Sequence, residues 1–357
     1  MEKQISIIIP TYNMERYIGK CLDSLLIPEL DAVEVLVVND GSKDRSSEIA
    51  HSYAKCYPNS IRVIDKENGN YGSCINTALP LATGRYVKVL DADDTFDTYA
   101  FSRLVNCLGS VNDDVVVTDF MEVDDAGNPH PSNRMSKYGL PAGKTLRLDE
   151  MGRADILQLA MHGIAYRRAI FSNIAYHQTE GISYTDTEWR IQPLCHAETV
   201  RYIDVGILYR YLIGREGQTM DPAIYLKSQR KVLDVWLSNA TYLSANSMQI
   251  NEKIIKRMED VIAENLYWVY WNYQKTEDHT LLRELAEFDR KLSMVNSSVF
   301  EQMERIKYFH RVNFHLVKGL RKKKFSPFKI PWHVNFRIKL VRWSISVKQL
   351  MTSLRHE

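Results

Sequence analysis

The stretch VKVLDADDTF, residues 87–96, joins an apolar segment directly to a group of acids. Residues 87–90 have the pattern of a buried strand, and the aspartates Asp91, Asp93 and Asp94 follow within four positions. Like charges placed so close together raise each other's pKa unless another group neutralises them. The strand is therefore expected to end at a site that binds a cation or a charged ligand.

Strand and helix patterns alternate along the first half of the chain. Short apolar runs predict buried strands, and the amphipathic stretches between them predict helices. The predicted strands are residues 4–10, 33–40, 61–65, 84–90 and 114–120, and the predicted helices are residues 13–26, 42–57 (N-cap Ser42 or Asp44) and 73–82. This alternation predicts an α/β fold with a mixed, mostly parallel sheet that is covered on both faces.

Polar residues follow the first, second and fourth predicted strands. In open sheets of this kind, ligands bind beyond the carboxyl ends of the strands. The residues at these ends and in the turn NGNYG that we expect to contact a ligand are Pro10, Thr11, Tyr12, Asn13, Asp40, Gly72, Asp91 and Ala92. Asp91 and Asp93 are two apart, so in an extended chain they point to one side. Mg²⁺ or Mn²⁺ would neutralise both carboxylates, and a solvated turn is the alternative.

Composition and charge exclude several classes of protein. The chain has 357 residues, of which 45% are hydrophobic and 25% charged, as in soluble globular proteins. No apolar run approaches the ~18 residues of a membrane span, and residues 5–9 are too short a run for a secretory signal. Five cysteines without a CxxC pair argue against a disulfide framework or a zinc site. We therefore expect a cytoplasmic protein.

Beyond residue 225 the pattern becomes helical, which predicts a catalytic region at 1–225 and a helical region at 226–357. From Arg305 to His356 there are 14 basic residues and no acidic ones, whereas the rest of the chain has 32 basic and 44 acidic residues. An apolar stripe runs through this basic tail at Phe336, Leu340, Trp343, Val347, Leu350 and Leu354. Such a helix is typical of peripheral binding to the anionic inner face of a cell membrane. Packing on the catalytic region and a homodimer contact are the alternatives.

Four stretches taken together resemble the inverting glycosyltransferases of family 2, which have the GT-A fold. They are ISIIIPTYN (5–13), VEVLVVNDGSKD (33–44), NGNYGSCINTALPLATGRYVKVLDADD (68–94) and YTDTEW (184–189). The resemblance covers about residues 4–220. It implies a Rossmann-like domain with a nucleotide-binding half at 1–95 and an acceptor half at 96–225. It also implies transfer of a hexosyl or N-acetylhexosaminyl group from a UDP-sugar to a glycan or lipid-linked acceptor, in surface polysaccharide or other glycoconjugate synthesis.

The resemblance also assigns roles to individual residues. In that family Thr11 and Tyr12 would line the uracil and ribose pocket, Asp40 would bind the base, and Asp93 would be the main metal ligand. Asp91 would contact ribose or the metal. A further stretch, YRYLIGREGQTMD (209–221), resembles the family's loop that closes over the diphosphate, which makes Arg215 and Gln218 candidates for binding it.

The stretch GISYTDTEW, residues 181–189, is expected to carry the catalytic base. The family has an acidic pair whose second member takes the acceptor's proton, and Asp186 matches that member. The first member is Thr185 here, and Glu188 is a substitute to consider. From the residues alone, Asp186 is most simply a helix N-cap. His162 lies where the family places residues that face the acceptor, with a structural histidine as the alternative.

Other functions fit the sequence less well. A nucleotidyltransferase would have a glycine-rich phosphate loop after the first strand, and PTYNMERY at residues 10–17 lacks glycine. A non-catalytic nucleotide-sugar-binding protein is favoured only by Thr185. Nucleic-acid binding by the basic tail lacks any recognised motif.

Overall fold

The computed structural model describes residues 2–130, 135, 139–215, 222–274, 279–307, 315–326, 332, 334 and 336. The chain divides into two compact units, Met1–Met258 and Glu259–Glu357. Among the helices in the described ranges, none combines the length and the apolar character needed to cross a bilayer.

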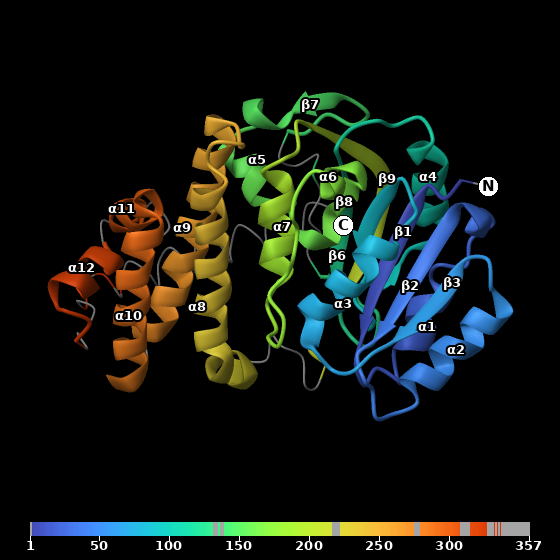
Figure 1. Cartoon of the computed structure of the whole chain (residues 1–357), viewed down its shortest axis with the longest axis horizontal. Helices are drawn as coiled ribbons and strands as arrows, with labels where there is room; N and C mark the ends of the chain where they lie inside the picture. The colour runs from blue at the N-terminus through green and yellow to red at the C-terminus, as the bar shows by residue number, and fades with distance from the viewer. Residues whose placement is uncertain are drawn as a thin grey trace. The chain divides into compact units, whose positions relative to one another are not determined.

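The first unit is built on a mixed sheet with the strand order β3-β2-β1-β4-β8-β6-β9-β5, and β7 pairs with β9. The strands are β1 (Ile5–Thr11), β2 (Val33–Asn39), β3 (Ile61–Asp65), β4 (Tyr86–Val89), β5 (Thr95–Phe96), β6 (Val115–Val123), β7 (Thr145–Arg147), β8 (Ile164–Arg167) and β9 (Thr199–Leu212). Strands β1 to β4 pair in parallel, as do β6 and β9, whereas β5, β7 and β8 run antiparallel to their neighbours. The predicted strands are confirmed, and Figure 1 shows β1, β2 and β3 side by side in blue.

Both faces of the parallel part of the sheet are buried, as its continuous apolar strands predict. Side chains alternate between the two faces along a strand. Ile5, Ile7 and Ile9 join one core with α1 (Ile18–Asp23), α2 (Ser46–Cys56) and α4 (Thr98–Leu108). Ile8 is fully buried on the opposite side, where α3 (Asn70–Ala78) packs against β1 and β2. The ends of β1, β2 and β4 therefore open onto one edge between helical layers.

The helix predicted over residues 13–26 is shorter than its pattern suggested. Asn13 has a φ of +54°, outside the right-handed helical region, and α1 begins only at Ile18. The second predicted helix is confirmed as α2. Asp44, one of its two proposed caps, accepts a hydrogen bond from the Ser46 backbone N–H at 3.0 Å.

The expected boundary after residue 225 falls inside a helix of the first unit. The later helices of that unit are α5 (Arg153–Leu157), the 3₁₀ turn η5 (Met161–Gly163), α6 (Ala169–Ser172), α7 (Asp186–Leu194) and α8 (Pro222–Ala245). Helix α8 packs against α7, and the Asn239 amide donates to the Thr187 hydroxyl at 3.2 Å. Helix α8 therefore belongs to the first unit, which extends to Met258. The functional division at residue 225 stays a prediction.

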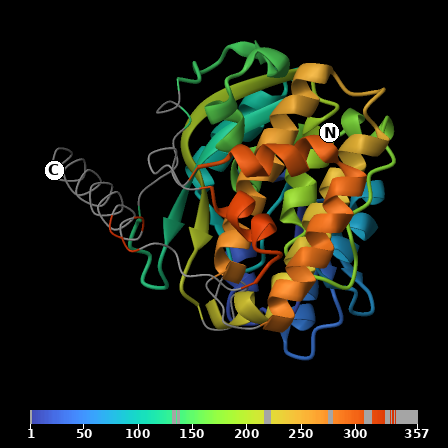
Figure 2. The same ribbon diagram turned by 90° about the vertical axis from the view of Figure 1, so that its left-hand side faces the viewer.

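The second unit is helical, as the sequence predicted. Helix α9 (Glu252–Gln274) crosses the boundary, and α10 (His279–Val295), α11 (Ser297–Arg305) and α12 (Leu316–Lys322) follow it. Figure 2 shows these last three helices in orange and red. Inside the unit, the Arg321 guanidinium and the Tyr270 hydroxyl both donate to Asp289 at 2.7 Å. The predicted membrane-binding stripe, apart from Phe336, lies outside the described residues.

Candidate active site

A cavity of about 190 Å³ opens beyond the carboxyl end of β4, where ligands are expected in sheets of this kind. It is lined by Tyr71, Asp91, Met161, His162, Ser183, Tyr184, Thr185, Asp186 and Tyr211. Tyr71 lies in the first turn of α3, His162 in η5 and Asp186 at the start of α7. Elements from both halves of the first unit therefore meet in one space.

The aspartates after β4 do not lie as an extended strand would place them. Strand β4 ends at Val89, and residues 91–94 form a turn closed by a hydrogen bond from the Asp94 N–H to the Asp91 carbonyl at 3.0 Å. A turn brings its first and fourth residues together, whereas the sequence argument paired Asp91 with Asp93. The extended-chain reasoning for that pair is therefore wrong, and each acid has its own surroundings.

Asp91 is the acid of this group that faces the cavity. Its carboxylate accepts a hydrogen bond from the Tyr71 hydroxyl at 2.9 Å, and its N–H donates to the Tyr209 hydroxyl at 3.2 Å. Burial raises the pKa of Asp91 to about 7, and the charges of Asp93 and Asp186 act in the same direction. A cation at this position would favour the ionised carboxylate.

Asp93 forms an ion pair with Arg215, through the guanidinium Nε and the carboxylate Oδ2. Only 14% of the Arg215 side chain and 10% of the Asp93 side chain are exposed. The guanidinium also lies over the Tyr17 ring, 5.8 Å from its centroid. The structure thus brings the predicted metal ligand together with one of the two predicted diphosphate-binding residues, while Gln218 lies outside the described residues.

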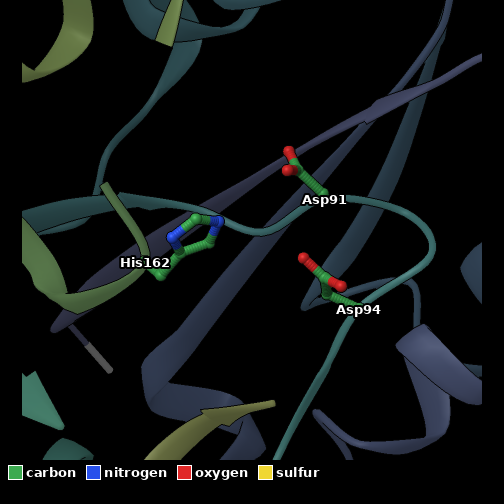
Figure 3. A group of neighbouring side chains, drawn as sticks. All are labelled: Asp91, Asp94 and His162. Carbon is green, nitrogen blue, oxygen red and sulfur yellow. The ribbon is translucent and has the colours of Figure 1, made fainter. Parts of the chain in front are cut away.

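Asp94, for which no role was predicted, is buried next to the cavity wall. Its carboxylate accepts from the Leu212 N–H at 2.7 Å and from the Tyr209 hydroxyl at 2.5 Å, and burial raises its pKa well above the usual range. Ligand-capable atoms of Asp91, Asp94 and His162 lie within 4.8 Å of one another (Figure 3). Two carboxylates and an imidazole form a donor set that suits a divalent cation such as Mn²⁺.

His162 lies among aromatic rings in the cavity wall. Its ring centroid is 4.5 Å from that of Tyr211, 4.9 Å from Tyr209 and 5.2 Å from Phe120. Burial, with a smaller effect of the Lys88 charge, lowers the pKa of His162 to about 3. The imidazole is therefore neutral at physiological pH and keeps a lone pair for a metal ion or a hydroxyl.

No role for Lys88 was predicted from the sequence. The residue is fully buried beneath this wall. Its ammonium donates to the backbone carbonyls of His162 at 2.6 Å and Ile164 at 3.1 Å. The rings of Phe96 and Tyr209 lie 5.9 and 5.6 Å from the nitrogen. Burial lowers the pKa of Lys88 to about 7. The lysine thus fixes η5, and with it the position of His162.

Replacing Lys88 by methionine should disturb His162 without unfolding the protein. Methionine is similar in length to lysine but cannot donate hydrogen bonds to the two carbonyls. It also removes the free-energy cost of burying an ammonium group. We expect turnover to fall by roughly 10-fold, as for residues that orient a functional histidine, with a cooperative melting transition retained. Steady-state kinetics of Lys88→Met and Lys88→Arg would test this. Full turnover in Lys88→Met would show that η5 needs no lysine.

Asp186 lies in the first turn of α7, at the cavity. Thr185 is the buried N-cap residue before it, and its hydroxyl donates to the Gln178 side-chain oxygen at 3.2 Å. Solvent in the cavity reaches Asp186, yet the protein around the carboxylate raises its pKa by desolvation. The charge of Asp186 contributes to the raised pKa of Asp91 and of Tyr71. The carboxylate is therefore close to both groups.

Glu188, two residues further on, is fully buried and does not line the cavity. Its carboxylate accepts from the Thr179 N–H and the Thr179 hydroxyl, both at 2.8 Å, and from the Ser238 hydroxyl at 2.6 Å. Both oxygens are thus occupied by the protein. This arrangement speaks against Glu188 as a substitute for Asp186.

Asp40, predicted to bind the nucleobase, directly follows β2, and its carboxylate contacts the N-terminus of α3. Its carboxylate accepts from the N–H groups of Gly69 and Asn70 at 2.9 Å and from the Lys66 ammonium at 2.7 Å. It is 2% exposed. The structure therefore gives Asp40 a capping role, and its contact with a base stays a prediction.

The other predicted nucleotide-binding residues differ in how accessible they are. Pro10, Thr11 and Ala92 are buried, whereas Tyr12 is 45% exposed. The Asn13 side-chain oxygen accepts from the Lys43 N–H at 2.8 Å, which joins the ends of β1 and β2. The Tyr12 ring is thus the member of this group that is open to stack on a base.

Gly72 is required by the protein's own backbone. A Cβ at this position would lie 2.2 Å from the Thr179 carbonyl oxygen, which is closer than atoms can approach. The sequence had suggested that this glycine lets a ligand approach. The structure shows that it lets the segment before α7 lie directly on α3, and its contact with a ligand stays a prediction.

Several residues of the cavity wall were not foreseen from the sequence. Tyr71, Tyr184 and Tyr211 were interpreted only as parts of a turn, a motif and a loop. The sequence feature that could have pointed to one of them is the position of Tyr71. This tyrosine lies in a turn about 20 residues before the acidic end of the strand. Which tyrosines face the cavity depends on contacts between distant segments, so a single sequence does not reveal it.

Comparison with known proteins agrees with this geometry. Residues 6–175 match the family model described as Glycosyl transferase family 2. The uncharacterized glycosyltransferase EpsJ of Bacillus subtilis (strain 168) is 31% identical over 210 residues, which cover 58% of this chain and 60% of EpsJ. The uncharacterized glycosyltransferase YibD of Escherichia coli (strain K12) is 27% identical over 216 residues, which cover 59% of this chain and 61% of YibD. The matches thus span about three fifths of these relatives.

Solved structures extend the likeness to the fold. The crystal structure of S. aureus TarS 1-349 in complex with UDP-GlcNAc has a TM-score of 0.64 to this chain at 22% identity. The match covers 83% of this chain and 82% of that one. The fold expected from the sequence is confirmed.

Proposed function

Because this chain belongs to glycosyltransferase family 2, with its match at residues 6–175, and has the GT-A fold, we propose that it transfers a sugar with inversion from a nucleotide-diphosphate sugar to an acceptor hydroxyl. The observation that carries this proposal is that Asp91, at the strand end, and Asp186, at the start of α7, line the same cavity. One carboxylate lies on the predicted donor side and the other on the predicted acceptor side.

The donor side has groups suited to a diphosphate and its cation. Asp91, Asp94 and His162 would hold the metal, with Asp93 as a further candidate. Bound Mg²⁺ or Mn²⁺ would supply positive charge against the negative charge that develops on the leaving diphosphate. The Arg215 guanidinium, which now contacts Asp93, offers paired donors for phosphate oxygens.

On the acceptor side, Asp186 would act as the general base. An acceptor hydroxyl attacks the anomeric carbon from the side opposite the diphosphate, which leaves with the bonding electrons, so the configuration inverts. The hydroxyl proton passes to the Asp186 carboxylate. Desolvation by the surrounding protein raises the pKa of that carboxyl, which makes its ionised form a stronger base than an ordinary aspartate.

The finer identity of the substrates follows from the resemblance. We infer a UDP-sugar as donor, carrying a hexosyl or N-acetylhexosaminyl group, which is supported by the fold shared with a protein whose structure contains UDP-GlcNAc. The acceptor would be a glycan or a lipid-linked glycan in surface polysaccharide or other glycoconjugate synthesis. A lipid-linked acceptor agrees with the basic tail, whose stripe would bring the enzyme to an anionic membrane.

Calorimetry and a panel of donors test the proposal. We expect UDP to bind and Mn²⁺ to tighten its binding, with GDP as the competing control. One or more of UDP-glucose, UDP-galactose, UDP-GlcNAc and UDP-GalNAc should release UDP slowly even without acceptor, as measured by a coupled UDP assay. Absence of UDP binding would refute the assignment of the donor. Tight binding without UDP release or transfer from any donor would instead identify a non-catalytic binding protein.

A further inference from the structure

We propose that Glu188 is a positioning residue that holds Asp186 in place from behind the cavity. It connects α7 to the preceding segment, residues 179–186, and to α8. The inference rests on the proposed function, in which Asp186 accepts the proton of the acceptor.

Glu188 is a carboxylate with neutral partners. The donors are the Thr179 N–H and hydroxyl at 2.8 Å and the Ser238 hydroxyl at 2.6 Å, and the side chain is fully buried. Burying a carboxylate without a cationic partner is costly. A glutamine of the same size would be less costly to bury, but its amide nitrogen cannot accept a hydrogen bond. A carboxylate accepts from all three donors at once, whereas a glutamine would keep the bond to the Thr179 N–H only if both hydroxyls reversed and accepted from its amide. The elements that these groups connect indicate the role of Glu188.

The segment that Glu188 holds contains a strained residue. Tyr184 has a φ of +71°, a conformation that a bulky side chain rarely adopts. Such a residue persists only where its surroundings hold it. Tyr184 lies between Thr179, which contacts Glu188, and Asp186 at the start of α7. The Glu188 bonds thus close a short loop that carries both Tyr184 and the proposed base into the cavity.

Other contacts fix the far end of this segment. The Asn76 side chain donates to the Gln178 carbonyl at 2.9 Å and accepts from the Gln178 N–H at 2.8 Å. The Gly181 N–H donates to the Gly69 carbonyl at 2.8 Å. These bonds attach the segment to α3, and Glu188 attaches it to the helix that bears Asp186. Hydrogen bonds at both ends of the segment therefore fix the position of Asp186 relative to α3.

Helix α8 supports the same turn from the other side. Ser238 contacts Glu188, and Asn239 donates to the Thr187 hydroxyl at 3.2 Å. The residues immediately after Asp186 are therefore bonded to α8. Most of α8 lies beyond the catalytic region predicted at residues 1–225, yet this helix helps to orient the proposed base.

A double-mutant cycle between Glu188→Gln and Asp186→Asn tests the inference. In the otherwise unchanged protein we expect Glu188→Gln to lower turnover by roughly 10- to 100-fold, the cost of a misplaced catalytic group. The Kd for UDP, measured by calorimetry, should change less than about 2-fold. In the Asp186→Asn background, Glu188→Gln should have almost no further effect on turnover, because the group that it positions is already gone. Rates are measured well below the melting temperature of each variant, and Glu198→Gln is the matched control.

The outcomes separate the two proposals. An undiminished rate in Asp186→Asn alone would overturn the assignment of the base. A reduced rate in Asp186→Asn, combined with the same fold-loss from Glu188→Gln in both backgrounds, would overturn only the positioning role. If Glu188→Gln does not fold, Ser238→Ala and Thr179→Val each remove one hydroxyl and enter the same cycle. Full additivity of both with Asp186→Asn would then refute the inference.

Discussion

We expect the replacement of Asp186 by asparagine to lower the rate of the proposed sugar transfer by about 10²- to 10⁴-fold, the usual contribution of a general base. The amide has the size of the carboxylate but cannot take the acceptor's proton. Donor binding persists, because the proposed nucleotide contacts lie on other elements. Turnover from a UDP-release assay and the Kd for UDP from calorimetry measure both quantities. Asp125→Asn, an exposed change in a distant turn, is the control.

The pH dependence of transfer checks the same assignment independently. A base works only when it is deprotonated, and burial raises the pKa of Asp186. Transfer is therefore lost as the pH falls through this raised pKa, at a higher pH than the ~3.9 of an ordinary aspartate would give. The residual rate of Asp186→Asn should lack this acidic limb. The same limb in wild type and variant would assign it to another group.

Replacing Asp93 by alanine is expected to reduce donor binding and turnover together. The carboxylate lies in the turn after β4 and contacts Arg215, so its loss affects both the proposed cation site and the proposed phosphate contact. Loss of residues that only orient metal ligands typically costs 10- to 100-fold, so for a candidate ligand we expect a loss of at least about 100-fold in kcat/KM. Titration with UDP and Mn²⁺, followed by donor kinetics, measures the effect.

Two controls distinguish the causes of such a loss. Circular dichroism shows whether the protein stays folded when Arg215 loses its partner. Chelation of wild-type protein should reproduce the loss, and added Mn²⁺ should restore activity in wild type only. Asp94→Ala, compared directly, shows which acid holds the cation. Undiminished turnover after chelation would refute the cation-dependent account, and undiminished turnover in Asp93→Ala would exclude Asp93 from the cation site.

The parallel part of the fold was predictable because its signals are local. Strand β3 occupies Ile61–Asp65, the predicted residues, since a short apolar run between polar turns allows few registers. Strand β5 has only two residues, and its partner β9 begins about a hundred positions later, so no local pattern reveals it. The amphipathic pattern of α8 was visible, but periodicity does not say which surface a helix covers.

The candidate site likewise has a part that was predictable from the sequence and a part that was not. Asp91 and Asp186 were proposed from their place in recognisable motifs, and the structure brings both to one cavity. The neighbourhood of Asp94, His162 and Lys88 was not foreseen. It depends on a turn where an extended strand was assumed, and on η5, which lies about 70 residues later. Spacing along the chain could not reveal either contact.

The contact between Gly72 and the Thr179 carbonyl has a consequence for the exchange of segments between this protein and its relatives. Segments that face an acceptor are natural candidates for exchange between relatives. Here, residues 178–181 rest on the backbone of α3 with no room for an added methyl group. A transplanted loop at residues 178–181 would therefore need the first turn of α3 from the same parent, so the two segments would have to be exchanged together.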